Sequence, residues 1–301
     1  MPEAVRREIP PPSLAPAHRA ACAQRAQVAS RSARIVISTS ATGAPLPPAE
    51  HPDGAPVIEV EGLTKLYDDL TAVDGLSFRV ASGEVLGLVG PNGAGKTTTL
   101  RSLCGIIRPT RGTIRVAGHD IVRDPVPAKR ALAFIPDEPQ LFEYLTVTEH
   151  LRFVGRVYGV SDAPARIDPL LAELELGDKR DALPGELSRG MRQKLAIACG
   201  LLHEPRALIL DEPLTGLDPA GIRKMKATIV ARARAGAAVL LSSHLLGLVE
   251  ELCTRILIIH GGRAVAIGAI GDIVAERPQL AGRGLEDIFL ALTGEGAPAP
   301  R

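Results

Sequence analysis

The chain has 301 residues, of which 46% are hydrophobic and 23% are charged, and its formal net charge is +1. These totals suit a globular protein of one or two domains, and the near-zero charge argues against a protein that coats nucleic acid with a broad basic face. No run approaches the roughly 18 consecutive apolar residues of a membrane-spanning helix, and no secretory leader is visible, so we expect a cytoplasmic protein without a span of its own. The four cysteines lie far apart and lack metal-type spacing, which favours a reducing compartment.

Residues 1–56 differ in composition from the rest of the chain. They contain ten of the 25 prolines, but none of the three tyrosines or five phenylalanines. A segment with so little apolar surface cannot offset the entropy lost on ordering. We therefore predict a disordered Arg/Pro/Ala-rich extension over residues 1–56, in preference to an organelle transit peptide.

The remaining chain alternates between strand and helix patterns. Two segments near its start, Val57–Val60 and Leu76–Val80, read as strands. Five apolar runs are typical of strands buried on both faces of a sheet: Val85–Val89, Leu132–Ile135, Ala207–Leu210, Val239–Ser242 and Arg255–Ile259. Helical patterns lie between several of these runs, which predicts an α/β domain with a largely parallel core sheet.

A glycine-rich loop follows Val85–Val89 and precedes a helical pattern at Thr99–Ile107. The loop matches GxxxxGK[ST] in the strand-to-helix setting that this motif requires, and its residues are Gly90, Pro91, Asn92, Gly93, Ala94, Gly95, Lys96, Thr97 and Thr98. Its glycines let successive backbone N–H groups face one anion at a helix N-terminus. Lys96 would contact the β- and γ-phosphates of a nucleotide, and the Thr97 hydroxyl would ligate Mg²⁺.

Two carboxylates follow the apolar run Ala207–Leu210. A carboxylate at the end of a buried strand is costly to desolvate unless it faces a cation or a water-filled cleft. Asp211 in this place can hold Mg²⁺ through its water shell, and Glu212 can orient or deprotonate the attacking water. Together with the loop, the pair predicts hydrolysis of a nucleoside triphosphate.

With these motifs in this order, residues 57–292 resemble the nucleotide-binding subunits of ABC transporters. Leu187–Met191 resembles the LSGGQ signature, Gly216–Asp218 the D-loop, and His244 the H-loop, while Tyr67 resembles the aromatic residue that stacks on adenine. The resemblance implies a P-loop NTPase fold with a mainly parallel core sheet, an antiparallel β subdomain and a helical subdomain.

The resemblance also implies that ATP is bound between two such subunits, paired head to tail. Each ATP would lie between the phosphate loop of one subunit and Ser188 and Gly190 of the other, with Glu212, His244 and Asp218 around the γ-phosphate. From the residues alone, Ser188 is as well explained by capping a helix, and Tyr67 by packing.

The sequence departs from the family pattern at three positions, one of which is Met191, where the signature usually has Gln. Asp137 stands where the family carries Gln, and an ionised Asp accepts but cannot donate a hydrogen bond, so we expect it to bind Mg²⁺ more directly and to alter the metal dependence. The alternative is that Gln140 fills the role. Arg189 stands in the signature where Gly is usual, and either brings a cation near the phosphates or points to solvent.

We expect the ATPase domain over residues 57–271, with its helical subdomain at about 138–184, and a C-terminal extension over 272–301. The apolar start of that subdomain either contacts a membrane partner or packs in the core, and consists of Leu141, Phe142, Tyr144 and Leu145. The ending Leu285–Gly294 resembles the tail of exporter-type subunits, which favours export.

The expected partners are an integral membrane permease at the cytoplasmic face of the plasma membrane and a second copy of the chain or a homologous subunit. No nucleic-acid partner is expected. Two alternatives remain, a soluble ABC-type ATPase not coupled to transport and a regulatory module that binds ATP without turnover. An intact Glu212 argues against the second alternative.

Overall fold

A computed structural model describes residues 56–277, 280 and 282–294, so the prediction for the N-terminal extension lies, apart from Pro56, outside the described residues. One sheet has the strand order β10-β9-β3-β8-β7-β6. Its strands are β3 (Val85–Val89), β6 (Leu132–Ile135), β7 (Ala207–Asp211), β8 (Ala238–Ser242), β9 (Arg255–His260) and β10 (Arg263–Gly268). All neighbouring strands run parallel except β9 and β10, which confirms the expected parallel core.

A second, antiparallel sheet has the order β2-β1-β4-β5. Its strands are β1 (Pro56–Tyr67), β2 (Leu70–Ala81), β4 (Arg111–Val116) and β5 (His119–Asp120). The sequence predicted only parts of β1 and β2, because register shifts between Val60 and Leu63 and again between Leu63 and Lys65 interrupt the alternation of inward and outward residues.

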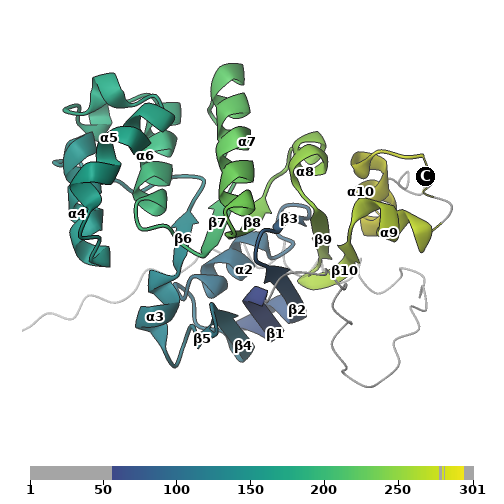
Figure 1. Cartoon of the computed structure of the whole chain (residues 1–301). Coiled ribbons are helices and arrows are strands. Elements are labelled where there is room, and N and C mark those ends of the chain that lie inside the picture. Colours follow the sequence, from purple (N-terminus) through teal and green to yellow (C-terminus); the bar gives the residue numbers. More distant parts are fainter. Residues whose placement is uncertain (1–55, 278–279, 281, 295–301) are drawn as a thin grey trace, which may run out of the picture. The chain divides into compact units, whose positions relative to one another are not determined.

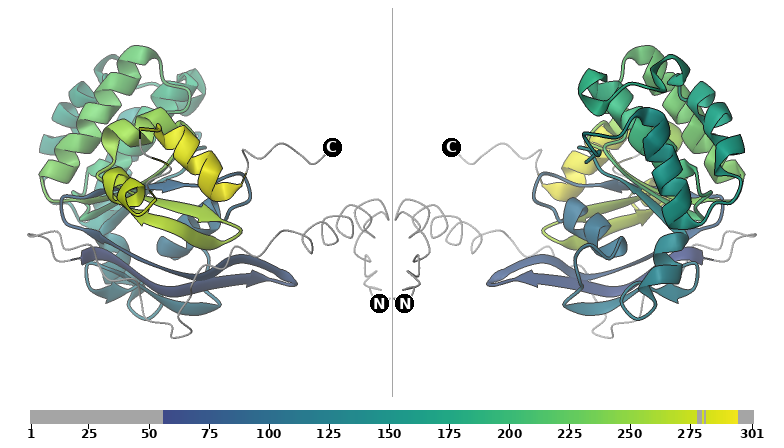
Figure 2. Two further views of the ribbon diagram at one scale, coloured as in Figure 1. Left: turned by 90° about the vertical axis from the view of Figure 1, so that its right-hand side faces the viewer. Right: turned by 90° about the vertical axis from the view of Figure 1, so that its left-hand side faces the viewer.

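The helices divide between the two faces of the parallel sheet (Figures 1 and 2). Helix α2 lies between the two sheets, whereas α6 and α7 pack on the opposite face of the parallel sheet, and α4 and α5 join that layer through contacts with α6 and with each other. The helices are α2 (Lys96–Leu103), α3 (Pro125–Arg130), α4 (Val147–Tyr158), α5 (Ala163–Glu173), α6 (Arg189–Leu201), α7 (Pro219–Arg234), α8 (Leu246–Leu252), α9 (Ile270–Ala275) and α10 (Leu285–Thr293). Short 3-10 turns lie at Gly177–Lys179 and Pro184–Glu186.

Strand β7 shows how the parallel sheet separates two hydrophobic cores. Its residues Leu208 and Leu210 belong to the core beneath α4 to α7, while Ala207 and Ile209 belong to the core between the sheets. Successive side chains of a strand point to opposite faces, so a strand covered on both faces must be apolar throughout. This is why the continuous apolar runs of the sequence became strands of the parallel sheet.

The predicted helix at Thr99–Ile107 is displaced. Helix α2 begins at Lys96, directly after Gly95 with φ of 103°, and ends at Leu103. Gly105, with φ of 62°, then turns the chain away from the helical path. Because the helix starts three residues earlier than expected, Lys96 and Thr97 lie in its first turn.

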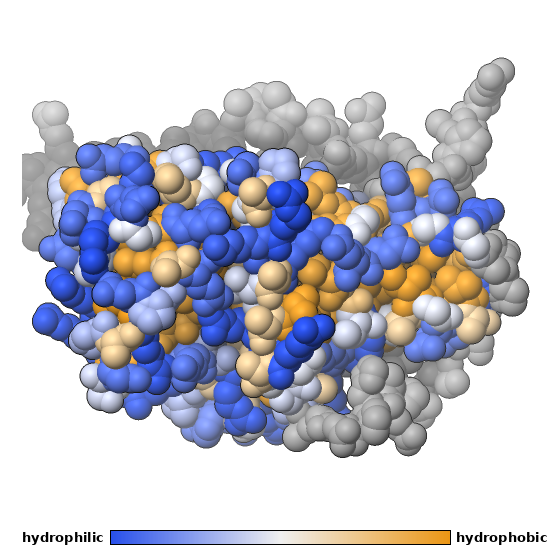
Figure 3. Space-filling view, turned by 45° about the horizontal axis from the view of Figure 1, so that its top comes forward, coloured by the Kyte–Doolittle hydropathy of each residue, from blue (hydrophilic) through white to orange (hydrophobic). Residues whose placement is uncertain are grey.

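Figure 3 shows the face that carries the helices, where hydrophilic and hydrophobic residues are interspersed. Hydrophobic residues also gather over α8 to α10, where Leu246, Val274 and Leu290 pack half-buried on a third core. Within residues 56–277, 280 and 282–294, no helix has the length and apolar character needed to cross a membrane.

Candidate active site

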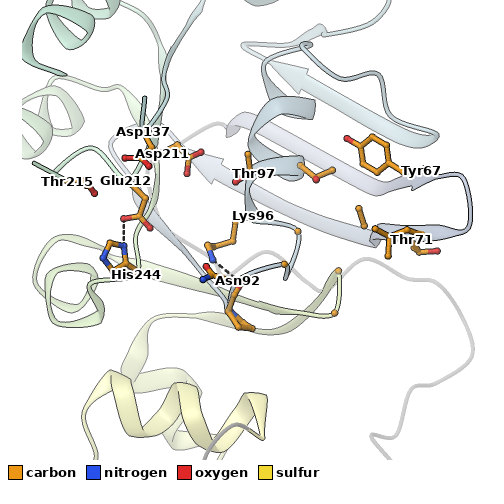
Figure 4. A pocket seen from close by; sticks show the side chains of 18 residues that line it. Tyr67, Thr71, Asn92, Lys96, Thr97, Asp137, Asp211, Glu212, Thr215 and His244 are labelled. Atoms are coloured by element: carbon orange, nitrogen blue, oxygen red, sulfur yellow. Dashed lines mark hydrogen bonds and ion pairs between the residues drawn. The ribbon is translucent and has the colours of Figure 1, made fainter. Parts of the chain in front are cut away.

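A cleft of about 850 Å³ lies at the carboxyl ends of β3 and β7 (Figure 4). It brings together segments that are far apart in the sequence: the turn between β1 and β2, the glycine-rich loop, and the residues that follow β6, β7 and β8. Of the residues predicted from the sequence, those that line it are Tyr67, Pro91, Asn92, Gly93, Gly95, Lys96, Thr97, Thr98, Asp137, Asp211, Glu212 and His244. Ligands of open α/β sheets bind at this edge.

The glycine-rich loop is tightly packed against its neighbours. A Cβ atom at residue 90 would lie 2.5 Å from the carbonyl oxygen of Ile259, and one at residue 95 would lie 2.5 Å from that of Ala72. These two glycines are required because the loop approaches other backbone, and Gly95 additionally has a positive φ. The Lys96 ammonium donates hydrogen bonds to the carbonyl oxygens of Gly90 and Pro91, the latter at 3.0 Å.

Asp211 and Glu212 extend from the end of β7 into the cleft. Asp211 pairs with Ser242 of β8 in the sheet register, and its Oδ1 accepts a hydrogen bond from the Ser242 hydroxyl. Ser242 and Ser243 were not among the site residues predicted from the sequence. Only the adjacency of β7 and β8 places their hydroxyls beside the two carboxylates.

Glu212 is held from two sides. Its Oε2 lies 2.8 Å from Nδ1 of His244 and accepts a hydrogen bond of 3.2 Å from the Ser243 hydroxyl. The Glu212 side chain is 17% exposed, whereas that of His244 is 64% exposed and reaches the open part of the cleft. Glu212 also has φ of 49°, a conformation that costs a non-glycine residue energy and is common at functional sites. This carboxylate is therefore fixed in position while one side of it remains accessible.

Asp137 lines the cleft, and Gln140 does not. The Gln140 amide instead makes a long contact of 3.5 Å to the carbonyl oxygen of Glu138. Asp137 pairs with Arg189 at 3.3 Å between Oδ1 and Nη2. Two of the departures from the family pattern, Asp137 and Arg189, are thus neighbours in space, an arrangement that neither of the two expectations for Arg189 included.

Ser188, Gly190 and Asp218 are not among the residues that line the cleft. Ser188 caps α6 by accepting a hydrogen bond from the Met191 N–H at 3.2 Å, which confirms the predicted cap. Asp218 caps α7 through the Gly221 N–H at 2.9 Å. Gly190 packs on the loop before α7, since a Cβ there would lie 2.9 Å from the carbonyl oxygen of Gly216.

Tyr67 stands at the rim of the cleft, at the end of β1 (Figure 4). It is 40% exposed, and the Lys65 ammonium lies 4.7 Å from its ring centroid. The ring therefore offers an accessible surface on which a planar group can stack, rather than being packed in the core.

The described cysteines take no part in this site. Cys104, Cys199 and Cys253 are free. Burial raises the pKa of Cys199 and of Cys253 to about 12, and that of Cys104 well above its usual value. Their thiols are therefore not thiolates at neutral pH, and nucleophilic chemistry at a cysteine is not expected.

Comparison with known proteins matches residues 73–215 to the family model described as "ABC transporter". The chain is 43% identical over 220 residues to the Nod factor export ATP-binding protein I of Paraburkholderia xenovorans strain LB400, covering 72% of both chains. It is 35% identical over 243 residues to the ABC-type transporter ATP-binding protein EcsA of Bacillus subtilis strain 168, covering 80% of this chain and 98% of the relative. A solved structure of an ATP-binding subunit of an ABC transporter matches with a TM-score of 0.76 and 37% identity over 79% of this chain and 99% of that one.

Proposed function

This chain belongs to the ABC transporter family as an ATP-binding, ATP-hydrolysing subunit, and on that premise we propose that its ATPase drives export through a separate membrane permease. The observation that carries the site assignment is Glu212, held by His244 and Ser243 beside Asp211 at the mouth of the phosphate loop.

ATP binds in the cleft with its adenine on Tyr67 and its phosphates on the loop Gly90–Thr98. The N-terminus of α2 presents backbone N–H groups and the positive end of its dipole to the phosphates. Lys96 exchanges its contacts with the loop carbonyls for contacts with the β- and γ-phosphates. The lining of the cleft supports this role of Lys96. Among the described residues that line it, Lys96 is the only lysine, and there is no arginine.

Glu212 acts as the general base toward the attacking water. Its contact with the Nδ1 of His244 orients the carboxylate, and the exposed imidazole is free to turn its other nitrogen toward the γ-phosphate. Proton abstraction by a positioned carboxylate contributes about 10²- to 10⁴-fold to a rate. The remaining acceleration comes from stabilising the charge of the transferred phosphoryl group by the loop and Lys96.

The cleft also suits Mg²⁺. Thr97, Asp211 and Asp137 supply hydroxyl and carboxylate oxygens, the hard donors that this ion prefers. In the part of the chain that the structure describes, no group of three or more His, Cys, Asp or Glu side chains is arranged to hold a metal by itself. Few protein ligands are expected for Mg²⁺, because nucleotide phosphates and water complete its shell. When bound, the ion neutralises phosphate charge.

A second subunit completes the site. Ser188 and Gly190 lie at the N-terminus of α6, an anion-binding position outside this chain's own cleft. We assign them, with Asp218, to the ATP of the opposite subunit, as in a head-to-tail dimer. Dimerisation driven by ATP and its reversal after hydrolysis supply the motion that the permease requires.

The permease contact is assigned to the exposed apolar residues before and along α4. Tyr144 is 88% exposed and Phe142 is 55% exposed, and Phe142 packs edge-on against Phe153 at 5.1 Å between ring centroids. Leu141, in contrast, packs partly buried against the core. Such a contact would hold the subunit at the cytoplasmic face of the membrane. The name of the Nod factor export protein among the relatives favours export.

The test is turnover of Glu212→Gln against the wild type, with Glu250→Gln, an exposed residue of α8, as the control. We expect the wild type and the control to hydrolyse Mg·ATP and Glu212→Gln to lose at least about 100-fold in kcat while forming an ATP-dependent dimer. Equal rates for all three proteins would contradict the role of Glu212. Co-purification of an integral membrane protein with the chain tests the coupling to transport.

A further inference from the structure

Before Mg²⁺ binds, the cleft has an excess of negative charge, because the described residues that line it include three carboxylates and one lysine. Asp137, Asp211 and Glu212 line it, and the nucleotide brings several further negative charges. A neutral side chain in place of Asp137 would avoid one of these charges. The carboxylate of Asp137 therefore needs a compensating cation, and the structure holds one within the same chain.

Arg189 is seated in a defined position beside Asp137. It is the first residue of α6, whose N-terminus is fixed by the Ser188 cap. Its aliphatic stem lies over Gly216, because a Cβ there would be 3.0 Å from Cδ of Arg189. Its guanidinium reaches Oδ1 of Asp137 at 3.3 Å.

A second contact joins the same face of α6 to the segment before α4. Gln193, one helical turn after Arg189, is buried, and its amide lies 3.5 Å from the carbonyl oxygen of Pro136. Arg189 and Gln193 thus flank the Pro136–Asp137 segment.

We propose that Arg189 is a positioning residue for Asp137: it neutralises and aims this carboxylate so that the cleft accepts ATP, and the two residues act as one pair. The inference rests on the proposed function, since it needs ATP in this cleft. The Arg189 side chain is 54% exposed and that of Asp137 is 42% exposed. Water therefore screens the ion pair, and its effect on ATP binding is moderate.

The test is a double-mutant cycle in the full-length chain, read as the KM for ATP and as kcat. Arg189→Gln removes the charge but keeps an aliphatic stem over Gly216 and a polar end. We expect it to raise KM about two- to fivefold, the range for exposed ion pairs, and to leave kcat nearly unchanged. In an Asp137→Gln background the same substitution should leave KM unchanged, and Arg189→Lys should restore most of the wild-type KM.

A binding measurement separates charge from turnover. In Glu212→Gln protein, ATP binding is measured in EDTA and in Mg²⁺. The weakening caused by Arg189→Gln should be larger in EDTA, and should shrink as salt is added. Arg192→Gln is the matched control, because Arg192 lies on the same helix but donates to the Leu187 carbonyl oxygen at 2.9 Å.

Two results would contradict the proposed pairing of Arg189 with Asp137. One is that Arg189→Gln changes the KM equally in the wild-type and Asp137→Gln backgrounds, and the other is that Arg192→Gln causes the same change in KM. Either result leaves the proposed function intact as long as the wild type turns over ATP and Glu212→Gln does not. Loss of activity in the wild type as well would instead count against the proposed function itself.

Discussion

Single residues fix the geometry around the carboxylate at the centre of the cleft. Glu212 has a positive φ, and its Oε2 contacts both His244 and Ser243. Ser243 is 2% exposed, and its hydroxyl also accepts a hydrogen bond from the Leu245 N–H at 3.1 Å. The serine therefore connects Glu212, the proposed general base, to the turn that carries His244.

We predict that Ser243→Ala lowers kcat about tenfold, because one hydrogen bond to a charged group is worth about 1.5–3 kcal/mol and the His244 contact remains. The KM for ATP should not change, since Ser243 is not among the residues that line the cleft. Steady-state kinetics measure both constants. Ser82→Ala, which removes a hydroxyl bound to the Gly236 carbonyl oxygen, is the control and should behave as the wild type.

At the scale of elements, the start of α6 has a structural role in addition to the ligand-binding role that we propose for it. Ser188 caps the helix, while Arg189 and Gly190 in the first turn contact Asp137 and the loop at Gly216. A helix N-terminus that is capped and firmly packed is a preformed anion site.

Substitutions at Ser188 separate these roles. We predict that Ser188→Ala destabilises the protein by about 1 kcal/mol, the usual cost of losing a cap. Ser188→Asp keeps a capping side chain, so thermal stability should be retained, yet its charge should repel the γ-phosphate and abolish ATP-dependent dimerisation. Thermal melts and size-exclusion chromatography of Glu212→Gln proteins measure the two effects. An Asp variant that dimerises normally would contradict the assignment to the opposite ATP.

Tyr158 at the end of α4 and His203, the second residue after α6, also form a pH-dependent contact. His203 stacks on Tyr158 with ring centroids 3.8 Å apart, and its Nε2 donates to the Leu132 carbonyl oxygen at 3.2 Å. Its buried Nδ1 has no hydrogen-bond partner among the described residues. Burial lowers the pKa of His203 below its ordinary value of 6.5, because a charged ring would be desolvated.

A lowered pKa in the folded state means that the unfolded chain binds the proton more readily. The contribution of neutral His203 to the free energy of unfolding is therefore complete above about pH 6.5 and is lost as the pH falls below it. We predict that the melting temperature falls between pH 7.5 and pH 5.5, and that His203→Phe, which keeps a stacking ring, reduces this fall. His260→Gln, a change at an exposed residue that ends β9, should leave the fall in melting temperature unaltered.

For the whole molecule, the question is which surface meets the permease. Tyr144 is the most exposed of the large hydrophobic residues in the part of the chain that the structure describes. We predict that Tyr144→Ser reduces the fraction of the chain recovered with membranes while the ATPase rate of the isolated protein is unchanged. Val126→Ser, which removes a comparably apolar exposed residue from α3, should retain membrane recovery. Equal recovery of the Tyr144→Ser and Val126→Ser proteins with membranes would contradict the assignment of the permease contact to Tyr144.

Much of the fold was predictable because strands covered on both faces have an unambiguous apolar pattern. The apolar runs Val85–Val89 and Leu132–Ile135 match β3 and β6 residue for residue. Strands β4, β5 and β10 were missed. They lie in the antiparallel sheet or at the edge of the parallel sheet, where partial exposure leaves a weaker pattern.

The sequence by itself determined the fold class, the phosphate loop and the pair Asp211–Glu212, because these depend on local order: a buried strand, then a polar group, then a helix. Only the tertiary structure decided which distant residues share the cleft. Strand order brings Ser242 and Ser243 beside the two carboxylates, and the packing of α6 brings Arg189 to Asp137 across 52 positions of sequence. Local sequence patterns do not predict such contacts, because contacts between distant segments depend on how the layers of the fold pack.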